Sequence, residues 1–314
     1  MVGWIRVSVD GPQGTAIHFQ FVEVLEHREA ATRPLRDCKA RDTLILSGKG
    51  RVEWEPKFTF HGFRYVEVEN WPGKLELDDI RGIVMHTDMQ GTGTFSCSNS
   101  LLNKLHENVR WSMRGNFLSI PTDCPQRDER LGWTGDINAF ADTANYLYDT
   151  AGMLSSWLRD LSLEQAAANG IVPLVDPNVI EGFDKEAHAV WGDVAVVLPW
   201  SIFLATGDIS LLFRQYGSMR TWLHAIPRRE NGLWDYTSEW KLGDWLDPAA
   251  PADSPGGEFI SLRSPFTSHN LWAGEWTILN NTDVNFRRNH RSNSRRRCLP
   301  STHHNPYGQN QHRT

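Results

Sequence analysis

The spacing of apolar residues changes once along this 314-residue chain, near residue 95. Before that point apolar and polar residues alternate in short runs, most clearly in Ala16–Val24, which is typical of half-buried β-strands. After it, apolar residues recur every three or four positions, which is typical of amphipathic helices. We therefore expect two domains of different class, with the boundary between residues 88 and 98.

The first domain, residues 1–94, is predicted to be a β-sandwich. Clusters of Gly, Pro, Asn and Asp separate its short apolar runs, as at Asp10-Gly-Pro and Asn70-Trp-Pro-Gly. The expected strands are Trp4–Val9, Ala16–Val24, Asp42–Ser47, Lys57–Phe60, Phe63–Val68 and Ile80–His86.

The second domain, residues 95–257, is predicted to begin with five helices joined by short loops. Ser98, Asp193 and Asp208 are candidate N-caps of the first, fourth and fifth of these helices, and Gly207 is expected to end the fourth. Such consecutive helices form helical hairpins. The apolar face expected on the first helix consists of Leu101, Leu102, Leu105, Val109 and Met113.

The C-terminal segment, residues 258–314, is predicted to be disordered because its apolar periodicity is lost. Residues 286–314 contain seven Arg and no Asp or Glu. Without them the net charge changes from −6 to −13, from 25 basic and 38 acidic residues. An acidic main body argues against a nucleic-acid partner, and the basic run is interpreted as a solvated segment.

Four scattered cysteines, with no Cys-x-x-Cys pair, indicate neither a metal site nor a disulfide framework. We expect free buried thiols, with which a reducing compartment is compatible, and no cofactor. The sequence shows no signal peptide and no apolar run of membrane-spanning length, so no membrane partner is expected. As written the chain is expected to be cytoplasmic, although a full-length parent could be secreted.

The densest group of charged and aromatic residues lies at Ile120–Phe140. Acidic side chains alternate there with Arg127, Arg130 and Trp133, and two Pro and two Gly residues exclude a regular helix over most of its length. Loops held by a rigid scaffold commonly carry binding and catalytic groups. Fourteen Trp residues also favour a carbohydrate ligand, because indole rings pack well against sugars. The alternative is a solvated loop with local ion pairs.

The run Pro121-Thr-Asp-Cys-Pro-Gln-Arg-Asp-Glu-Arg-Leu-Gly-Trp-Thr-Gly-Asp136 resembles the signature of the α-L-rhamnosidases of glycoside hydrolase family 78. The resemblance continues in Phe58-Thr-Phe-His-Gly-Phe-Arg-Tyr-Val-Glu-Val, Val190-Trp-Gly-Asp and Gly243-Asp-Trp-Leu-Asp-Pro. It covers approximately residues 2–257, and a run of this length is a specific signal.

This resemblance implies an (α/α)6 barrel preceded by β-sandwich domains, with residues 95–257 as the N-terminal part of the barrel. It also implies inverting hydrolysis of terminal α-L-rhamnose by two carboxylic acids, with a small rhamnoside as the substrate. By motif match Glu129 is the general acid. The other residues that the match assigns to the rhamnose site are Asp123, Arg127, Trp133, Asp136, Trp191 and Trp245.

The chain departs from the family pattern at the general base. The family's base is a Glu in a Trp-Glu-Arg-Trp-like context late in the barrel, and this chain has no such motif. Glu258 and Glu275 are the remaining candidates. The prediction is a truncated, catalytically impaired α-L-rhamnosidase. The alternatives are a non-catalytic rhamnoside-binding module and an inactive gene-model fragment.

Overall fold

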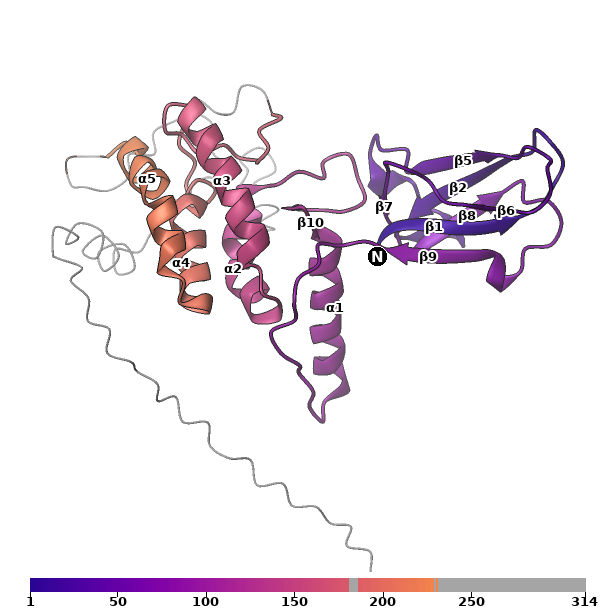
Figure 1. The fold of residues 1–314 in the computed structure, drawn as a ribbon, viewed down its shortest axis with the longest axis horizontal. Helices are drawn as coiled ribbons and strands as arrows, with labels where there is room; N and C mark the ends of the chain where they lie inside the picture. The colour runs from indigo at the N-terminus through magenta and orange to yellow at the C-terminus, as the bar shows by residue number, and fades with distance from the viewer. Residues whose placement is uncertain (181–185, 229, 231–314) are drawn as a thin grey trace, which may run out of the picture. The chain divides into compact units, whose positions relative to one another are not determined.

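The structure is a computed structural model that describes residues 1–180, 186–228 and 230 (Figure 1). The segment predicted to be disordered, residues 258–314, therefore lies outside the described residues. The same holds for Trp245, Glu258 and Glu275.

The N-terminal part consists of two antiparallel sheets. In the first, β1 pairs with three strands, and Val7 lies opposite both Trp54 and Ile80. In the second, β2 lies between β5 and β8. The first sheet contains β1 (Val2–Val9), β6 (Val52–Trp54), β7 (His61–Gly62) and β9 (Ile80–Val84). The second contains β2 (Ala16–Val22), β5 (Arg41–Ile45) and β8 (Tyr65–Glu69).

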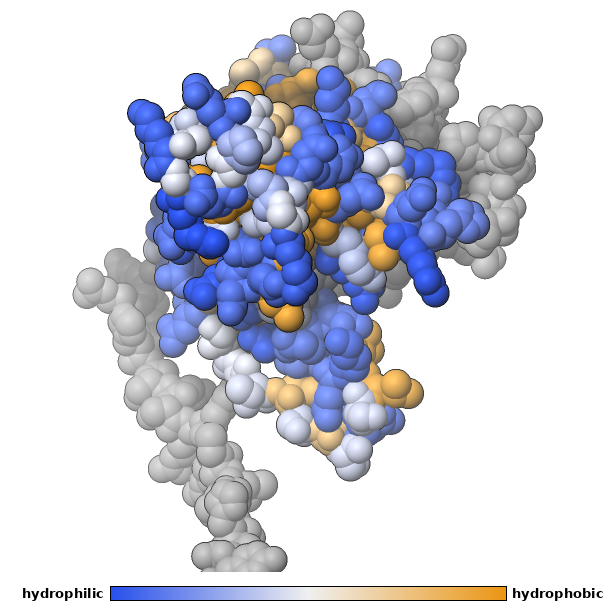
Figure 2. All heavy atoms as spheres, turned by 90° about the vertical axis from the view of Figure 1, so that its right-hand side faces the viewer, coloured by the Kyte–Doolittle hydropathy of each residue, from blue (hydrophilic) through white to orange (hydrophobic). Residues whose placement is uncertain are grey.

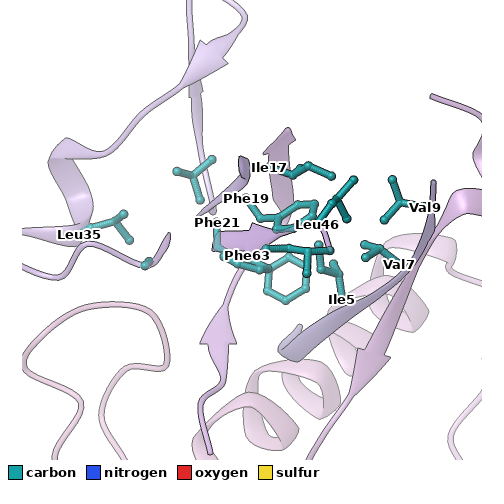
Figure 3. Packing of buried hydrophobic residues seen from close by; sticks show 12 residues of the cluster. Ile5, Val7, Val9, Ile17, Phe19, Phe21, Leu35, Leu46 and Phe63 are labelled. Carbon is teal, nitrogen blue, oxygen red and sulfur yellow. The ribbon is translucent and has the colours of Figure 1, made fainter. Parts of the chain in front are cut away.

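The two sheets share one hydrophobic core, which makes them a sandwich. Alternate residues of β1 from Ile5 to Val9 and of β2 from Ile17 to Phe21 point into this core, because successive side chains of a strand point to opposite faces. Figure 3 shows the β1 side chains directed toward the phenylalanines of β2. The central residues of the core are Ile5, Val7, Val9, Ile17, Phe19, Phe21, Leu46 and Phe63.

One expected strand is wrong, and several shorter elements were not expected. Lys57–Phe60 is not a strand: Phe58 has φ 60° and is fully exposed. Its run of alternating residues is too short to indicate a strand, and Pro56, which precedes it, cannot donate a backbone hydrogen bond to a sheet. The unexpected elements are β6, β7, the ribbon β3 (Leu25–Glu26) with β4 (Glu29–Ala30), and 3-10 turns at Arg33–Leu35 and Leu77–Asp79.

The described part of the second domain contains the five expected α-helices. Helix α4 packs between α2 and α5, and α3 packs against both α4 and α5. Trp157 and Trp222 are fully buried in this helical core. None of the described helices is long and apolar enough to span a bilayer. The helices are α1 (Ser100–Asn116), α2 (Thr134–Leu147), α3 (Ala151–Ala167), α4 (Val194–Thr206) and α5 (Ile209–Ala225).

The helix caps agree with the sequence only in part. Asp208 caps α5, since its Oδ1 accepts a hydrogen bond from the Ser210 N–H at 2.8 Å, and Gly207 ends α4 with φ 74°. Helix α1, however, is capped by Asn99 and not by Ser98, because the Leu101 N–H donates to Asn99 Oδ1 at 2.9 Å.

The apolar face of α1 is only partly buried. Met113 is buried, but Leu101, Leu102 and Leu105 are 77%, 48% and 57% exposed, and the described residues leave them uncovered. In Figure 2 orange spheres gather toward the lower end of an otherwise mostly hydrophilic face. Apolar spacing therefore predicted the helix correctly but not the burial of its face.

Candidate active site

The segment with the signature begins at a tight hairpin and closes into a loop. After α1, β10 (Phe117–Leu118) and β11 (Ile120–Pro121) turn around Ser119, which has φ 68°. The Asp123 N–H then donates to Leu131 O at 3.1 Å, and Asp123 Oδ1 accepts from the Leu131 N–H at 3.1 Å. Asp123 thus holds the two ends of the loop together.

Arg127 joins two carboxylates of this loop. Its Nη2 lies 3.4 Å from Asp123 Oδ2 and 3.0 Å from Glu129 Oε2. Glu129 Oε2 also pairs with Arg36 Nη1, which comes from the β-sandwich domain just after the 3-10 turn. These ion pairs hold the Glu129 carboxyl group in one orientation. The side chain is 20% exposed, so the carboxyl group is still accessible to a ligand.

Two further contacts join the loop to the β-sandwich domain. The Arg130 guanidinium lies 4.1 Å from the centre of the Phe60 ring, and its Nη1 donates to Phe60 O at 3.3 Å. A Cβ on Gly62 would lie 2.7 Å from the Pro125 backbone, so the two backbones approach closely. Sequence reasoning missed Arg36, because it lies 93 residues from Glu129 and no local pattern marks it.

The start of α2 is held by a second strand-like segment, residues 172–176. The Thr134 N–H donates to Leu174 O at 2.9 Å, and the Asp176 N–H donates to Gly132 O at 2.9 Å. The buried Thr134 hydroxyl donates to Leu174 O at 3.0 Å. A Cβ on Gly132 would lie 2.1 Å from Asp176 O, so only glycine fits there. These contacts fix Trp133, which directly precedes α2.

Asp136 lies in the first turn of α2 and carries the most informative electrostatics of the site. Burial, then the charge of Asp123 and then that of Glu129, raise the pKa of Asp136 to about 6. The residue as a whole is nevertheless exposed, so water screens part of this effect. The cause shows that the charges of Asp123 and Glu129 act on Asp136.

The indole of Trp191 packs against α2. A Cβ on Gly135 would lie 2.7 Å from Trp191 Nε1 and 2.8 Å from its Cε2. The structure therefore brings Trp191 against the first turn of α2, which also carries Asp136, although the two residues are far apart in the sequence. Of the residues predicted for the site only Trp245 cannot be placed, since it lies outside the described residues. The individual roles of these residues stay predictions.

Several buried polar atoms on these elements have no hydrogen-bond partner among the described residues. Buried donors and acceptors are almost always paired, so such a group of atoms indicates a place for a polar ligand. Gln126 and Asn138 were not identified from the sequence, because nothing local distinguishes an amide that binds a ligand. The unpaired atoms are Gln126 Oε1, Arg127 Nε, Trp133 Nε1, Asn138 Oδ1, Trp191 Nε1 and both carboxyl oxygens of Asp176.

The described residues of the site bear on metal and thiol chemistry in two ways. In the part of the chain that the structure describes, no three His, Cys, Asp or Glu residues are grouped to hold a metal ion. Cys124 lies inside the loop, and burial together with its hydrogen bond to Asp123 raises the pKa of its thiol to about 12. The thiol therefore stays protonated and a poor nucleophile.

Both domains match known protein families. The bacterial alpha-L-rhamnosidase concanavalin-like domain matches residues 1–86, and the bacterial alpha-L-rhamnosidase 6 hairpin glycosidase domain matches residues 90–261. These matches confirm the predicted β-sandwich followed by part of an (α/α)6 barrel. The exact boundaries at residues 94 and 257 stay predictions.

Similar curated proteins are named alpha-L-rhamnosidases. The chain is 44% identical over 248 residues to an alpha-L-rhamnosidase of Streptomyces avermitilis, covering 79% of this chain and 24% of that protein. It is 34% identical over 275 residues to one from Formosa agariphila, covering 86% and 28%. The chain thus spans about a quarter of the length of these relatives.

Solved structures agree with these relatives. The native rhamnosidase from Aspergillus terreus superposes with a TM-score of 0.83 at 49% identity, covering 90% of this chain and 34% of that one. The Streptomyces avermitilis enzyme complexed with L-rhamnose superposes with a TM-score of 0.74 at 43% identity, covering 78% and 24%. The chain belongs to the α-L-rhamnosidases of glycoside hydrolase family 78.

Proposed function

We propose that this chain is the part of an inverting α-L-rhamnosidase that recognises rhamnose and supplies the general acid, Glu129. The observation that carries the proposal is the set of unpaired polar atoms on the loop that contains Glu129, on α2 and on Trp191. The relative from Streptomyces avermitilis, whose structure is described as a complex with L-rhamnose, supports the choice of sugar.

The geometry suits the acid half of the reaction. In an inverting hydrolase one carboxylic acid protonates the leaving oxygen, while a carboxylate on the opposite face, about 6.5–9.5 Å away, activates water. In this proposal Glu129 transfers its proton to the glycosidic oxygen, and Arg127 orients it through the 3.0 Å contact. Asp136, whose pKa is about 6, remains partly protonated in weakly acidic solution and can donate a hydrogen bond to a sugar hydroxyl.

The aromatic residues suit a deoxy sugar. Trp191 lies against Gly135 in the first turn of α2, and Trp133 directly precedes this helix, so both residues lie at the end of α2 that carries Asp136. An indole offers a flat apolar surface for the methyl-bearing side of rhamnose, while its N–H can bind a hydroxyl. The Nε1 atoms of both indoles are unpaired among the described residues, as this role requires.

No described residue matches the general base of the family. The family's base motif does not occur in this sequence, and Glu258 and Glu275 lie outside the described residues. We therefore propose that this chain binds rhamnosides but hydrolyses them slowly. The second candidate is a rhamnoside-binding module without catalytic capacity.

Turnover of p-nitrophenyl α-L-rhamnoside with and without azide tests the proposal. Without a base the attacking water is not deprotonated, so we expect little turnover; azide needs no deprotonation and should increase the rate by forming the inverted rhamnosyl azide. General acid assistance is worth about 10²–10⁴-fold, but an activated aryl leaving group needs little of it. Glu129→Gln should therefore affect the aryl substrate weakly and a natural flavonoid rhamnoside strongly.

The possible outcomes distinguish a slow hydrolase from a rhamnoside-binding module. Rhamnose binding without any azide-dependent rate would favour the binding module. Absence of rhamnose binding in isothermal titration calorimetry would contradict the proposal. Rapid turnover without azide would show that a base is present, and Glu258→Gln and Glu275→Gln would be the first variants to measure.

A further inference from the structure

The turn that carries Trp191 is held in an unfavourable backbone conformation. Val190, which directly precedes it, has φ 70°. A β-branched residue rarely adopts this left-handed region, and it persists only where surrounding contacts enforce it. Such strained residues are concentrated at functional sites.

Both backbone polar groups of Val190 are bound by side chains. Its N–H donates to Asp193 Oδ2 at 2.9 Å, and its carbonyl accepts from Asn138 Nδ2 at 3.0 Å. Asp193 is 2% exposed, and its other oxygen, Oδ1, accepts from Trp222 Nε1 at 3.1 Å. A network that is buried and hydrogen-bonded in this way allows little adjustment.

The turn is also held by packing. A Cβ on Gly192 would lie 2.1 Å from Trp222 Cη2, so the backbone of the turn rests directly on a fully buried indole. On the other side, Asn138 and Gly135 lie three positions apart on α2 and therefore share one face of that helix. The same helical face thus binds Val190 and supports the Trp191 indole.

Capping of α4 does not explain Asp193. Asp193 occupies the N-cap position, but its side chain makes no capping hydrogen bond to the helix. Both of its oxygens are used by Val190 and Trp222 instead. The buried carboxyl group of Asp193 therefore stabilises the turn at Val190 and does not cap α4.

We propose that Asp193 is a positioning residue for the rhamnose site, which together with Asn138 holds Val190 in its left-handed conformation and thereby sets the plane of the Trp191 indole against Gly135. This inference rests on the proposed function, because the indole is taken as a wall for rhamnose. Asp193 itself is buried and acts through Trp191.

Asp193→Asn is the test, because Asn keeps the shape but offers one acceptor oxygen and places an NH2 group against a donor. Two quantities are measured in the full chain: the Nε1–H resonance of Trp191 in a ¹H–¹⁵N spectrum, assigned with Trp191→Phe, and the Kd for L-rhamnose. We expect the resonance to shift and the Kd to rise at least about tenfold.

Gln165→Met is the matched control. Gln165 is equally buried, and it donates to Gly170 O at 3.1 Å and to Ser218 O of α5 at 3.2 Å, so its hydrogen bonds join α3 to α5 and not α2 to the turn. The Gln165→Met variant should have a lower Tm but an unchanged Trp191 resonance and an unchanged Kd for L-rhamnose. Equal effects of both variants, or an unchanged resonance in Asp193→Asn, would overturn the proposal.

Val190→Gly provides a rescue, because glycine adopts positive φ without cost. Combined with Asp193→Asn it should restore part of the Trp191 resonance position and of the affinity, even if the single variant folds poorly; no recovery would contradict the role of backbone strain. If the unmodified chain does not bind rhamnose, the proposed function fails, while the resonance still decides whether Asp193 positions Trp191.

Discussion

Gly135→Ala is the most direct perturbation of the predicted sugar wall. The added methyl group would lie 2.7 Å from Trp191 Nε1, 2.8 Å from Cε2 and 3.0 Å from Cδ1. These distances are well below ordinary van der Waals contact, and three atoms of one rigid ring are involved. The indole therefore has to move away from α2.

Two effects of opposite sign determine the stability of this variant. Alanine in a helix is favoured over glycine by about 1 kcal/mol. Inserting a methyl group into a packed contact costs about 1–3 kcal/mol. We expect net destabilisation of about 0–2 kcal/mol, with a rise of at least about tenfold in the Kd for L-rhamnose, or about 1.4 kcal/mol.

Gly217→Ala is the matched control, since Gly217 lies within α5 and its added methyl group would meet no atom within 4 Å. It should stabilise the chain by about 0.5–1 kcal/mol and raise Tm by about 1–4 °C, with rhamnose affinity unchanged. Calorimetric titration and thermal unfolding check both variants. If Gly135→Ala binds rhamnose as tightly as the unmodified chain, Trp191 is not a wall of the site.

Three further predictions concern single groups. The folded-state pKa of Asp136 is raised from 3.8 to about 6, so the folded protein holds this proton more tightly and stability should fall as pH rises from about 4 to 6; Asp136→Asn should remove that slope in urea unfolding. Burial, then the charges of Glu164 and Asp160, raise the pKa of Asp176 to about 7, and both of its buried oxygens lack a partner among the described residues. Because the ionised carboxylate is unfavourable there, Asp176→Asn should be more stable than the unmodified chain at pH 8 and not at pH 4. Arg36→Met should change stability by less than about 1 kcal/mol, because the Arg36 side chain is 49% exposed, but should speed amide hydrogen exchange around Glu129, whereas Arg33→Met, which breaks an exposed pair with Glu26, should not.

The sequence was most informative where structure repeats locally. Alternation in β1 and β2 predicted the buried faces that contain Val7 and Phe19, and helical spacing predicted all five described helices. Local chemistry also identified the Asp208 cap and the end of α4 at Gly207. These features depend on residues a few positions apart, so their pattern is written in the sequence itself.

The same patterns failed where burial depends on other elements. The apolar spacing of α1 is regular, yet Leu101 and Leu105 are exposed, because spacing reports a helix and not what covers it. Lys57–Phe60 alternates like a strand but pairs with nothing, since a strand requires a partner as well as a pattern.

The sequence and the tertiary structure each determined part of the candidate site. The run around Glu129 was recognisable in the sequence because it resembles the family signature, and a short loop brings its Asp123, Arg127 and Glu129 together. Only the tertiary structure decided that Arg36 would reach Glu129 and that Trp191 would lie on Gly135. Those contacts join residues of separate elements, whose meeting is set by how the sheets and helices pack, and no local spacing of residues encodes that geometry.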